Sequence, residues 1–201
     1  MSMHIDGKKV TAMYWGGRKI REAWYEGERV FSGKPVEVMP ATPGDWDAYT
    51  WLREKVTEYG ESYETVTELP FEIDPSQATK MPSMFERFSA LTVVPAMDTS
   101  QVTDMSLMFN GCSSLTTVPA MDTSQVTDMQ SMFRDCSSLT TVPDMDTRSV
   151  MNAVQMFDGC SSLTDGNVRL IGRHPNVDTG GMIRRSGLTR EPFYDSSGRP
   201  I

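Results

Sequence analysis

The feature that most constrains this chain is a 24-residue repeat in its middle. Residues 97–120 and 121–144 are identical at 19 of 24 positions. Residues 145–168 form a further copy that diverges towards its end, and residues 73–96 form an earlier one with Phe88 where the others have cysteine. A unit of this length cannot bury its own apolar face, so the copies are expected to stack on one another as a solenoid.

Within each unit, the residue types predict a short strand, a turn and a short helix. Residues 115–119 are β-branched and end in proline, which favours a strand. Asp122 predicts a turn, because its side chain can accept hydrogen bonds from the next backbone amides. Thr127 is the candidate N-cap of a helix. The apolar residues that follow share one helix face at spacing i, i+3, i+4: Met129, Met132 and Phe133.

Methionine supplies 16 of the 201 residues, and ten of these recur at repeat positions. In a stack of units with strands about 4.8 Å apart, each repeat position becomes a column. Methionine fills irregular gaps in cores, so packing explains the excess better than a soft-metal site does. The predicted core columns are Met81, Met105, Met129; Met84, Met108, Met132, Met156; Met97, Met121, Met145; Phe85, Phe109, Phe133, Phe157; and Cys112, Cys136, Cys160.

Two of the columns carry groups with chemistry of their own. Neighbouring cysteines could cross-link, but three in a row leave one unpaired, and Phe88 in the first copy favours a small apolar slot. Asp98, Asp122 and Asp146 form an acidic ladder that could hold Ca²⁺. The ladder lacks the glycine-rich spacing of calcium-binding β-roll repeats, so capping of the local turns is the favoured interpretation.

The predicted strands also carry a polar face. Threonines recur there and could bind a partner or could simply be solvated, and both interpretations stay open. The candidate partner-binding residues are Thr92, Thr116, Thr117, Thr140 and Thr141. The copies differ chiefly at residues 106–107 against 130–131 and 110–111 against 134–135, and these pairs are expected to face solvent.

Charge excludes some function classes. Residues 35–164 carry 6 basic and 19 acidic groups, a net −13, against +3 for residues 1–34 and +2 for residues 165–201. An acidic body repels phosphate, so we expect no nucleic-acid partner. Only two histidines and no Cys-x-x-Cys pair argue against zinc. With no nucleophile–base pair in view, we expect no catalytic residue, no cofactor and no enzymatic activity.

The repeat pattern DTSxVTDMxxMFxxCSSLTxVPxM resembles the BspA-type leucine-rich repeats of bacterial surface proteins, including many mycoplasma lipoproteins. The resemblance covers residues 73–168. It implies a mainly β or α+β, leucine-rich-repeat-like solenoid of about four coils, with a parallel sheet on one side and short helices on the other. It also implies an adhesion or interaction module without catalysis.

The N-terminal region has a period of ten residues. Gly7, Gly17 and Gly27 predict the turns of a small antiparallel β-meander over residues 1–34. Its strands carry aromatic side chains on both faces and are too few to close a core, so we expect them to dock on another protein. The predicted anchoring residues are Tyr14, Trp15, Trp24, Tyr25 and Phe31. This arrangement is similar to the short amino-terminal modules of phage tail and virion proteins.

The remaining segments are interpreted as a linker and two caps. Residues 35–44 are a predicted proline-rich linker, and residues 45–72 a helical N-terminal cap. Its helix is expected over residues 45–60, capped by Asp45 and ended by Gly60. Residues 169–201 are expected to form a degenerate last coil and a tail. The arginines of that tail could pair with the acidic body or a partner, but a solvated cap is favoured: Arg184, Arg185 and Arg190.

Together these features predict a non-enzymatic structural protein of a bacteriophage virion, of the minor-tail or tail-fibre type. The N-terminal module would attach to the particle, and the repeats would serve adhesion and host recognition. Capsid decoration and a bacterial cell-surface BspA-like adhesin are the alternatives, and a cytosolic interaction module is the fallback. We expect other virion proteins as partners, a homo-oligomer, and a host surface glycan or protein as receptor. No signal peptide or membrane span is expected, in keeping with assembly in the host cytoplasm.

Overall fold

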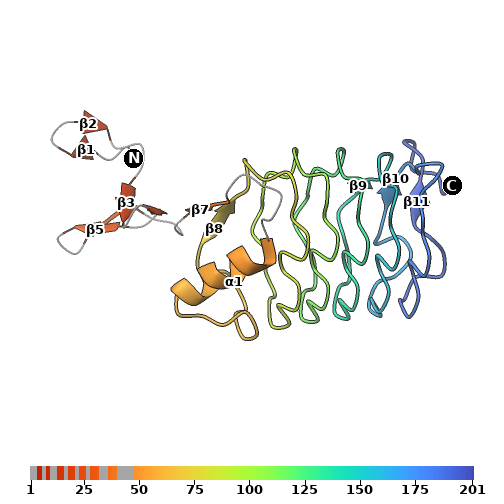
Figure 1. Ribbon diagram of the computed structural model, residues 1–201, viewed down its shortest axis with the longest axis horizontal. Coiled ribbons are helices and arrows are strands. Elements are labelled where there is room, and N and C mark those ends of the chain that lie inside the picture. Colours follow the sequence, from red (N-terminus) through yellow and green to blue (C-terminus); the bar gives the residue numbers. More distant parts are fainter. Residues whose placement is uncertain are drawn as a thin grey trace.

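The computed structural model describes residues 4–5, 8–9, 13–15, 18–20, 23–25, 28–31, 36–39 and 48–201. In these ranges the chain has one α-helix and short strands, and Figure 1 shows the later segments following one another along the long axis. The elements are β1 His4–Ile5, β2 Lys8–Lys9, β3 Met13–Trp15, β4 Arg18–Ile20, β5 Ala23–Tyr25, β6 Glu28–Phe31, β7 Val36–Val38, α1 Ala48–Glu58, β8 Glu72–Asp74, β9 Met145–Asp146, β10 Leu170–Ile171 and β11 Phe193–Tyr194.

The N-terminal strands form antiparallel hairpins. β1 pairs with β2, β3 with β4, and β5 with β6. The strands of each pair are two residues apart in the sequence, and the second of those residues is the predicted turn glycine. They are not one continuous meander, because the described part of β4 pairs with β7 rather than with β5. β7 in turn pairs in parallel with β8, so the segment predicted as a linker contains a strand. Val36 and Val38 flank Glu37 in the alternating pattern that suits a strand.

Successive 24-residue copies are joined side by side by backbone hydrogen bonds. The amides of residues 105, 107, 109 and 111 donate to carbonyls of residues 128, 130, 132 and 134 in the next copy, over 2.8–3.0 Å. The intervening amides of residues 108, 110 and 112 instead bond three residues back within their own copy. Three parallel bridges join residues 24 apart: Lys80 with Asp104, Asp104 with Asp128, and Asp128 with Asn152. A fourth joins Asn152 with Asp178, 26 residues further on. The prediction of a mainly β or α+β chain with parallel pairing is confirmed.

The local structure inside each copy differs from the prediction. No helix forms over residues 127–133: Asp128 is a bridge residue, consecutive turns follow over residues 130–135, and residues 115–119 have no assigned strand. Leu107 and Gly111 have φ angles of 58° and 75°, and a left-handed residue interrupts a right-handed helix. Thr127 is not an N-cap, because its hydroxyl donates to the carbonyl of Thr103 at 3.1 Å. The i, i+3, i+4 spacing does place apolar residues on one side of the chain. The backbone there forms turns, however, and alternate amides donate to carbonyls of the neighbouring copy.

All of the methionine, phenylalanine and cysteine columns are buried, each member being at most 8% exposed. The phenylalanine column forms a stack with centroid separations of 5.3, 5.4 and 5.6 Å and interplanar angles of 11°, 7° and 1°. Such offset stacks satisfy the quadrupole preference of aromatic rings at this separation. Of the residues expected to face solvent, Ser131 is instead buried at 2% exposure.

The helical cap lies at the N-terminal end of the copies. α1 buries Ala48, Leu52 and Val56 in the same core, and Gly60, with φ of 80°, ends the helical segment as predicted. Arg53 lies between the rings of Tyr49 and Tyr63, at 3.3 and 3.8 Å from their centroids. Asp45, the predicted cap of this helix, lies outside the described residues. None of the described helices is long and apolar enough to cross a membrane.

The C-terminal segment adds two parallel strands and covers the outer edge of the last one. β10 pairs in parallel with β9, and β11 with β10. The chain then folds back, so that Tyr194 bridges Pro200 in the antiparallel sense and Ile201 donates its amide to the carbonyl of Phe193 at 3.1 Å. This return covers the last strand, whose free edge would otherwise be open to pairing with another chain.

Two arginines of this segment are paired with the acidic body, so the favoured interpretation of a solvated cap is wrong for them. The Asp158 side chain is fully buried and accepts hydrogen bonds from Arg184 at 2.7 Å and from Arg185 at 2.9 Å. Burial acts to raise the pKa of Asp158, but the hydrogen bonds from Arg185 and Arg184 outweigh it and hold the pKa below its ordinary value. A buried carboxylate needs such partners, which a comparison of the copies by sequence does not reveal.

The core columns make a prediction about stability. Phe133→Ala is expected to lower the free energy of unfolding by about 3–5 kcal/mol, because it removes a ring from the middle of the stack and leaves a cavity. Met132→Leu keeps the volume, so it should cost less than about 1.5 kcal/mol. Urea unfolding followed by circular dichroism measures both. Equal losses for the two variants would contradict this account of the core.

The Asp158 ion pair makes a prediction about pH. Its folded pKa is lowered, so its contribution is complete above the unfolded value of about 3.9 and is lost as pH falls through the folded pKa. Asp158→Asn should cost about 1–3 kcal/mol at pH 7 and flatten the loss of stability on acidification. Arg184→Ala with Arg185→Ala should cost more, about 3–5 kcal/mol, because it leaves a buried charge unpaired. Urea unfolding at several pH values tests this, and an unchanged acid profile in Asp158→Asn would refute it.

Candidate interaction surface

The threonine face is exposed and regular. All of its candidate residues are exposed: Thr92, Thr116, Thr117, Thr140 and Thr141. Thr140 donates both its amide, at 3.0 Å, and its hydroxyl, at 3.1 Å, to the carbonyl of Thr116 in the preceding copy. Thr92 makes the same pair of bonds to the carbonyl of Thr67, at 2.9 and 3.0 Å. These bonds join Thr140 to the preceding copy and Thr92 to the N-terminal cap.

The hydrogen bonds of these threonines determine what the face can offer a partner. A hydroxyl has one hydrogen to donate and two lone pairs that accept. Because Thr92, Thr140 and Thr141 donate their hydrogens to carbonyls of adjoining segments, they leave acceptor oxygens available at the surface. The side chains are also held in defined positions, which reduces the conformational entropy that binding would otherwise cost.

A second set of threonines was not singled out from the sequence. These residues are only 1–2% exposed, and their hydroxyls donate to carbonyls of the segment that follows each copy: Thr99 to Asp122 at 2.9 Å, Thr123 to Asp146 at 3.0 Å, and Thr147 to Gly172 at 2.5 Å. Their position beside the repeated aspartates is visible in the sequence, but residue type alone does not separate buried threonines from exposed ones.

The acidic ladder caps turns. The carboxylate of Asp98 accepts from the amide of Ser100 at 3.0 Å, and that of Asp122 from the amide of Ser124 at 3.0 Å. These backbone bonds, helped by the serine side chains, lower the pKa values of both aspartates. The pKa of Asp146 is lowered chiefly by Arg148, whose side chain is hydrogen-bonded to it. The favoured interpretation, turn capping, is what the hydrogen bonds show.

The ladder does not assemble a calcium site in the structure. Throughout the described ranges, no group of three or more His, Cys, Asp or Glu side chains could hold a metal ion. The three carboxylates stay with the turn amides of their own copies instead of converging on one point. A cation of the calcium type requires six or more oxygen ligands around a single position.

The three cysteines are buried free thiols. Each donates its S–H to a phenylalanine carbonyl of the preceding copy: Cys112 to Phe85 at 3.0 Å, Cys136 to Phe109 at 3.0 Å, and Cys160 to Phe133 at 2.9 Å. Burial raises the pKa of Cys112 and of Cys160 to about 12, and it raises the pKa of Cys136 as well. The thiols therefore donate hydrogen bonds to the backbone, and their raised pKa favours the protonated form at neutral pH.

The predicted anchoring residues fall in the N-terminal hairpins. Tyr14 and Trp15 belong to β3, where they are register partners of Lys19 and Arg18. The other three lie in the β5–β6 hairpin, which contains an irregularity in register: Trp24, Tyr25 and Phe31. Their side chains lie outside the described part of the structure. The structure thus places the five residues in two hairpins and leaves their anchoring role a prediction.

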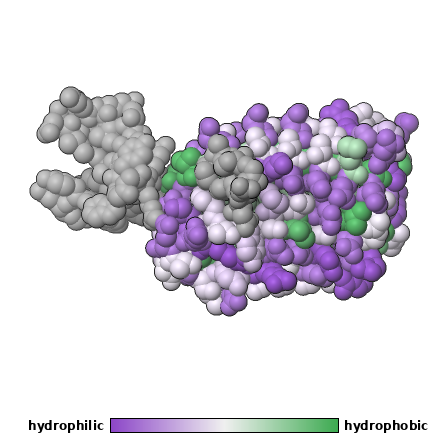
Figure 2. Space-filling view, in the orientation of Figure 1, coloured by the Kyte–Doolittle hydropathy of each residue, from purple (hydrophilic) through white to green (hydrophobic). Residues whose placement is uncertain are grey.

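The exposed surface is predominantly polar. On the face seen in Figure 2, hydrophilic residues dominate and hydrophobic ones appear as small separate spots. Among large apolar residues, the most exposed in the described ranges are single positions: Val38, Val93, Met151 and Ile201, at 50–58%. A partner that binds this body would therefore meet a polar, acidic surface rather than one broad apolar patch.

The comparison with protein families supports part of the sequence interpretation. Residues 79–170 match the model of a family described as Mycoplasma protein of unknown function, DUF285. The match falls within the repeats and their continuation into β10 and covers 92 of 201 residues. Neither curated proteins nor solved structures show a match to this chain.

The buried thiols lead to a prediction about reactivity. A thiol reagent such as dithionitrobenzoate should leave the folded chain almost unmodified, because burial and a raised pKa suppress the thiolate, and it should titrate three thiols in urea. The variant Thr116→Cys is the matched control, since that position is exposed and should react at once in the folded chain. Rapid modification of folded wild-type protein would contradict the burial described here.

Proposed function

We propose that this chain is a non-enzymatic structural protein of a bacteriophage virion, of the minor-tail or tail-fibre type. In this proposal the N-terminal hairpins attach the chain to the particle, and the repeats, as a leucine-rich-repeat-like solenoid of about four coils, present the threonine face to a host receptor. The observation that carries the proposal is the parallel, 24-residue register of the copies, which repeats one exposed polar pattern along a rigid body.

The connection between the N-terminal hairpins and the repeats supports this division of roles. The β3–β4 hairpin is joined through β7 to β8, next to the first repeat. An attachment module would thereby be connected to the body by strand pairing. The repeats themselves fit recognition, because stacked units create an extended surface in which each copy adds the same contacts. No cofactor enters the proposal.

A bacterial cell-surface adhesin of the BspA type is the second candidate. The match of residues 79–170 to a family described from Mycoplasma favours it. The two proposals share an adhesive repeat body and differ in what the N-terminal hairpins contact. A capsid decoration protein would differ only in the part of the particle to which the hairpins attach.

Deletion of residues 1–34 in a phage that encodes the chain tests the proposal. The truncated chain should be absent from purified particles, as measured by mass spectrometry of separated heads and tails. Thr116→Lys with Thr140→Lys is the matched control, because it changes the exposed face, and it should leave incorporation intact while reducing adsorption to host cells. Normal incorporation of the truncated chain would overturn the attachment role, and wild-type protein found in heads alone would favour capsid decoration.

A further inference from the structure

The hydrogen bonds that join the middle segments of successive copies all run in one direction. Between residues 105–111 and 128–134 the amides belong to the earlier segment and the carbonyls to the later one. At the last junction, alternate amides of residues 153–159 donate in the same way to carbonyls of residues 178–184, over 2.8–3.0 Å. The peptide dipoles of these rows therefore add, as they do in a helix, and the end with free amides is partially positive.

The last of these segments ends the rows with unused donors. The bridge between Asn152 and Asp178 sets its register, so the donor positions fall on the amides of Thr179, Gly181, Ile183 and Arg185. In the described part of the chain none of these four amides donates to an acceptor. The carbonyls of residues 178–184, in contrast, all accept hydrogen bonds. We call residues 179–185 the donor edge, because its unused backbone groups there are N–H donors.

The donor edge is accessible and lies beside positive charge. Gly181 and Arg185 are exposed, and Ile183 is partly exposed although it packs against the core. The side chains of Arg184 and Arg185 are 58% and 57% exposed, even though both pair with Asp158. A partner for this edge therefore has to present hydrogen-bond acceptors.

The opposite end of the stack is covered. α1 lies at that end, away from the C-terminus (Figure 1), and packs against the core. Arg53 of this helix donates to the carbonyl of Glu86 at 3.0 Å. Glu86 holds the repeat position of Asn110, whose carbonyl accepts the amide of Arg87 from the preceding copy. The cap thus occupies an acceptor of the first copy, so two identical chains cannot stack end to end while α1 is in place.

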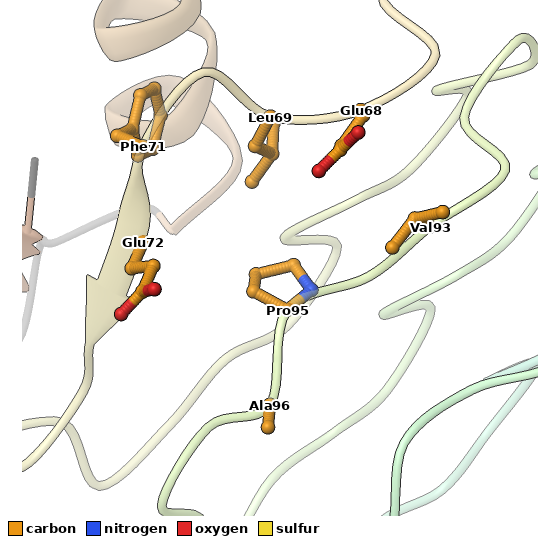
Figure 3. A pocket seen from close by; sticks show the side chains of 7 residues that line it. All are labelled: Glu68, Leu69, Phe71, Glu72, Val93, Pro95 and Ala96. Carbon is orange, nitrogen blue, oxygen red and sulfur yellow. The ribbon is translucent and has the colours of Figure 1, made fainter. Parts of the chain in front are cut away.

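A pocket also lies at the covered end, but its carboxylates are engaged. It has a volume of about 560 Å³ and lies between residues 68–72, which lead into β8, and residues 93–96 of the first copy (Figure 3). Glu68 and Glu72 line it, and both interact with other groups of the protein. The unused amides of the donor edge are therefore the stronger indication of a partner.

We propose that the donor edge binds a backbone segment of a partner protein that carries the same 24-residue repeat pattern. At each internal junction an equivalent row of amides is filled by such a segment, which presents carbonyls at every second residue. Addition of a segment to an open edge provides affinity through backbone hydrogen bonds and specificity through side chains. A single phosphate or sulfate fits less well, because the donors are spread along residues 179–185 instead of converging on one point. The partner's first copy has to lack a covering helix.

Hydrogen exchange followed by NMR on the full-length chain first tests whether the edge is open. The amides of Gly181 and Ile183 should exchange roughly 100-fold faster than those of Gln155 and Phe157. The latter two hold the equivalent positions one copy earlier and donate to carbonyls of the last segment, so they are a matched internal control.

A synthetic peptide of residues 121–144, with Cys136→Ser to prevent oxidation, is the probe for binding. It should bind weakly and saturably, shift the amide resonances of residues 179–185 and slow their exchange. A peptide of the same composition in scrambled order should do neither. The experiment uses isolated protein, so its outcome does not depend on attachment to a virion.

Variants at Ile183 separate the backbone donor from the side chain. Ile183→Pro removes one amide and should weaken the peptide about two- to tenfold, since a hydrogen bond contributes about 0.5–1.5 kcal/mol net. Ile183→Ala keeps the amide, so the peptide should still protect residue 183. If Ile183→Pro disrupts the segment, the same peptide tethered to Ile201 by a flexible linker should protect the wild-type edge at a high effective concentration.

Four results would overturn the proposal. Slow exchange at Gly181 and Ile183 in the free chain would show that the edge is already covered. Equal protection by the scrambled peptide would remove the requirement for the repeat pattern. Dimers in sedimentation of the free chain that protect these amides would assign the edge to a second copy. Inorganic polyphosphate that produces the same shifts with equal or higher affinity would assign it to a polyanion.

Discussion

Hydrogen bonds between neighbouring copies are the interaction on which the rest of this structure depends. Alternate amides between residues 105 and 111 have their acceptors in the next copy, and only the intervening amides are satisfied locally. A single copy would leave half of these donors without a partner, and unpaired buried amides are costly. The same bonds bring equivalent residues into contact, so the phenylalanine stack, the methionine columns and the exposed threonines all follow from one register.

The segments at the two ends of the joined copies make contacts that the copies between them do not make. At the C-terminal end, Tyr194 pairs with Pro200, and the fold-back covers the last strand. Asp158, buried one copy before the end, is balanced by Arg184 and Arg185 of the final segment. At the N-terminal end, α1 covers the core, but the walls near Val93 separate and leave a pocket. The buried ion pairs and the pocket, which the repeat does not contain, lie at these boundaries, where each element has a different neighbour on each side.

Much of the candidate surface could be predicted because it obeys the repeat. The exposed positions of Thr116 and Thr140, and the turn-capping role of Asp98 and Asp122, both follow from comparing copies. The predicted helix at Thr127 failed because i, i+3, i+4 spacing reports which side chains share a side, not which backbone conformation places them there. The buried Thr123 and the buried Asp158 were missed because polar residues in the interior depend on partners elsewhere in the chain.

The sequence by itself determined the register of the copies and which apolar residues share a column, because identical residues 24 positions apart are expected to occupy equivalent environments. Only the tertiary structure decided where the polar groups find their partners. Left-handed residues such as Leu107 set the direction of neighbouring amides, and hence whether they bond within a copy or between copies. The hydrogen bond of the Cys136 thiol, the ion pairs of Asp158 and the pocket beside Glu68 all depend on these backbone directions. Aligning the copies by sequence does not reveal such directions.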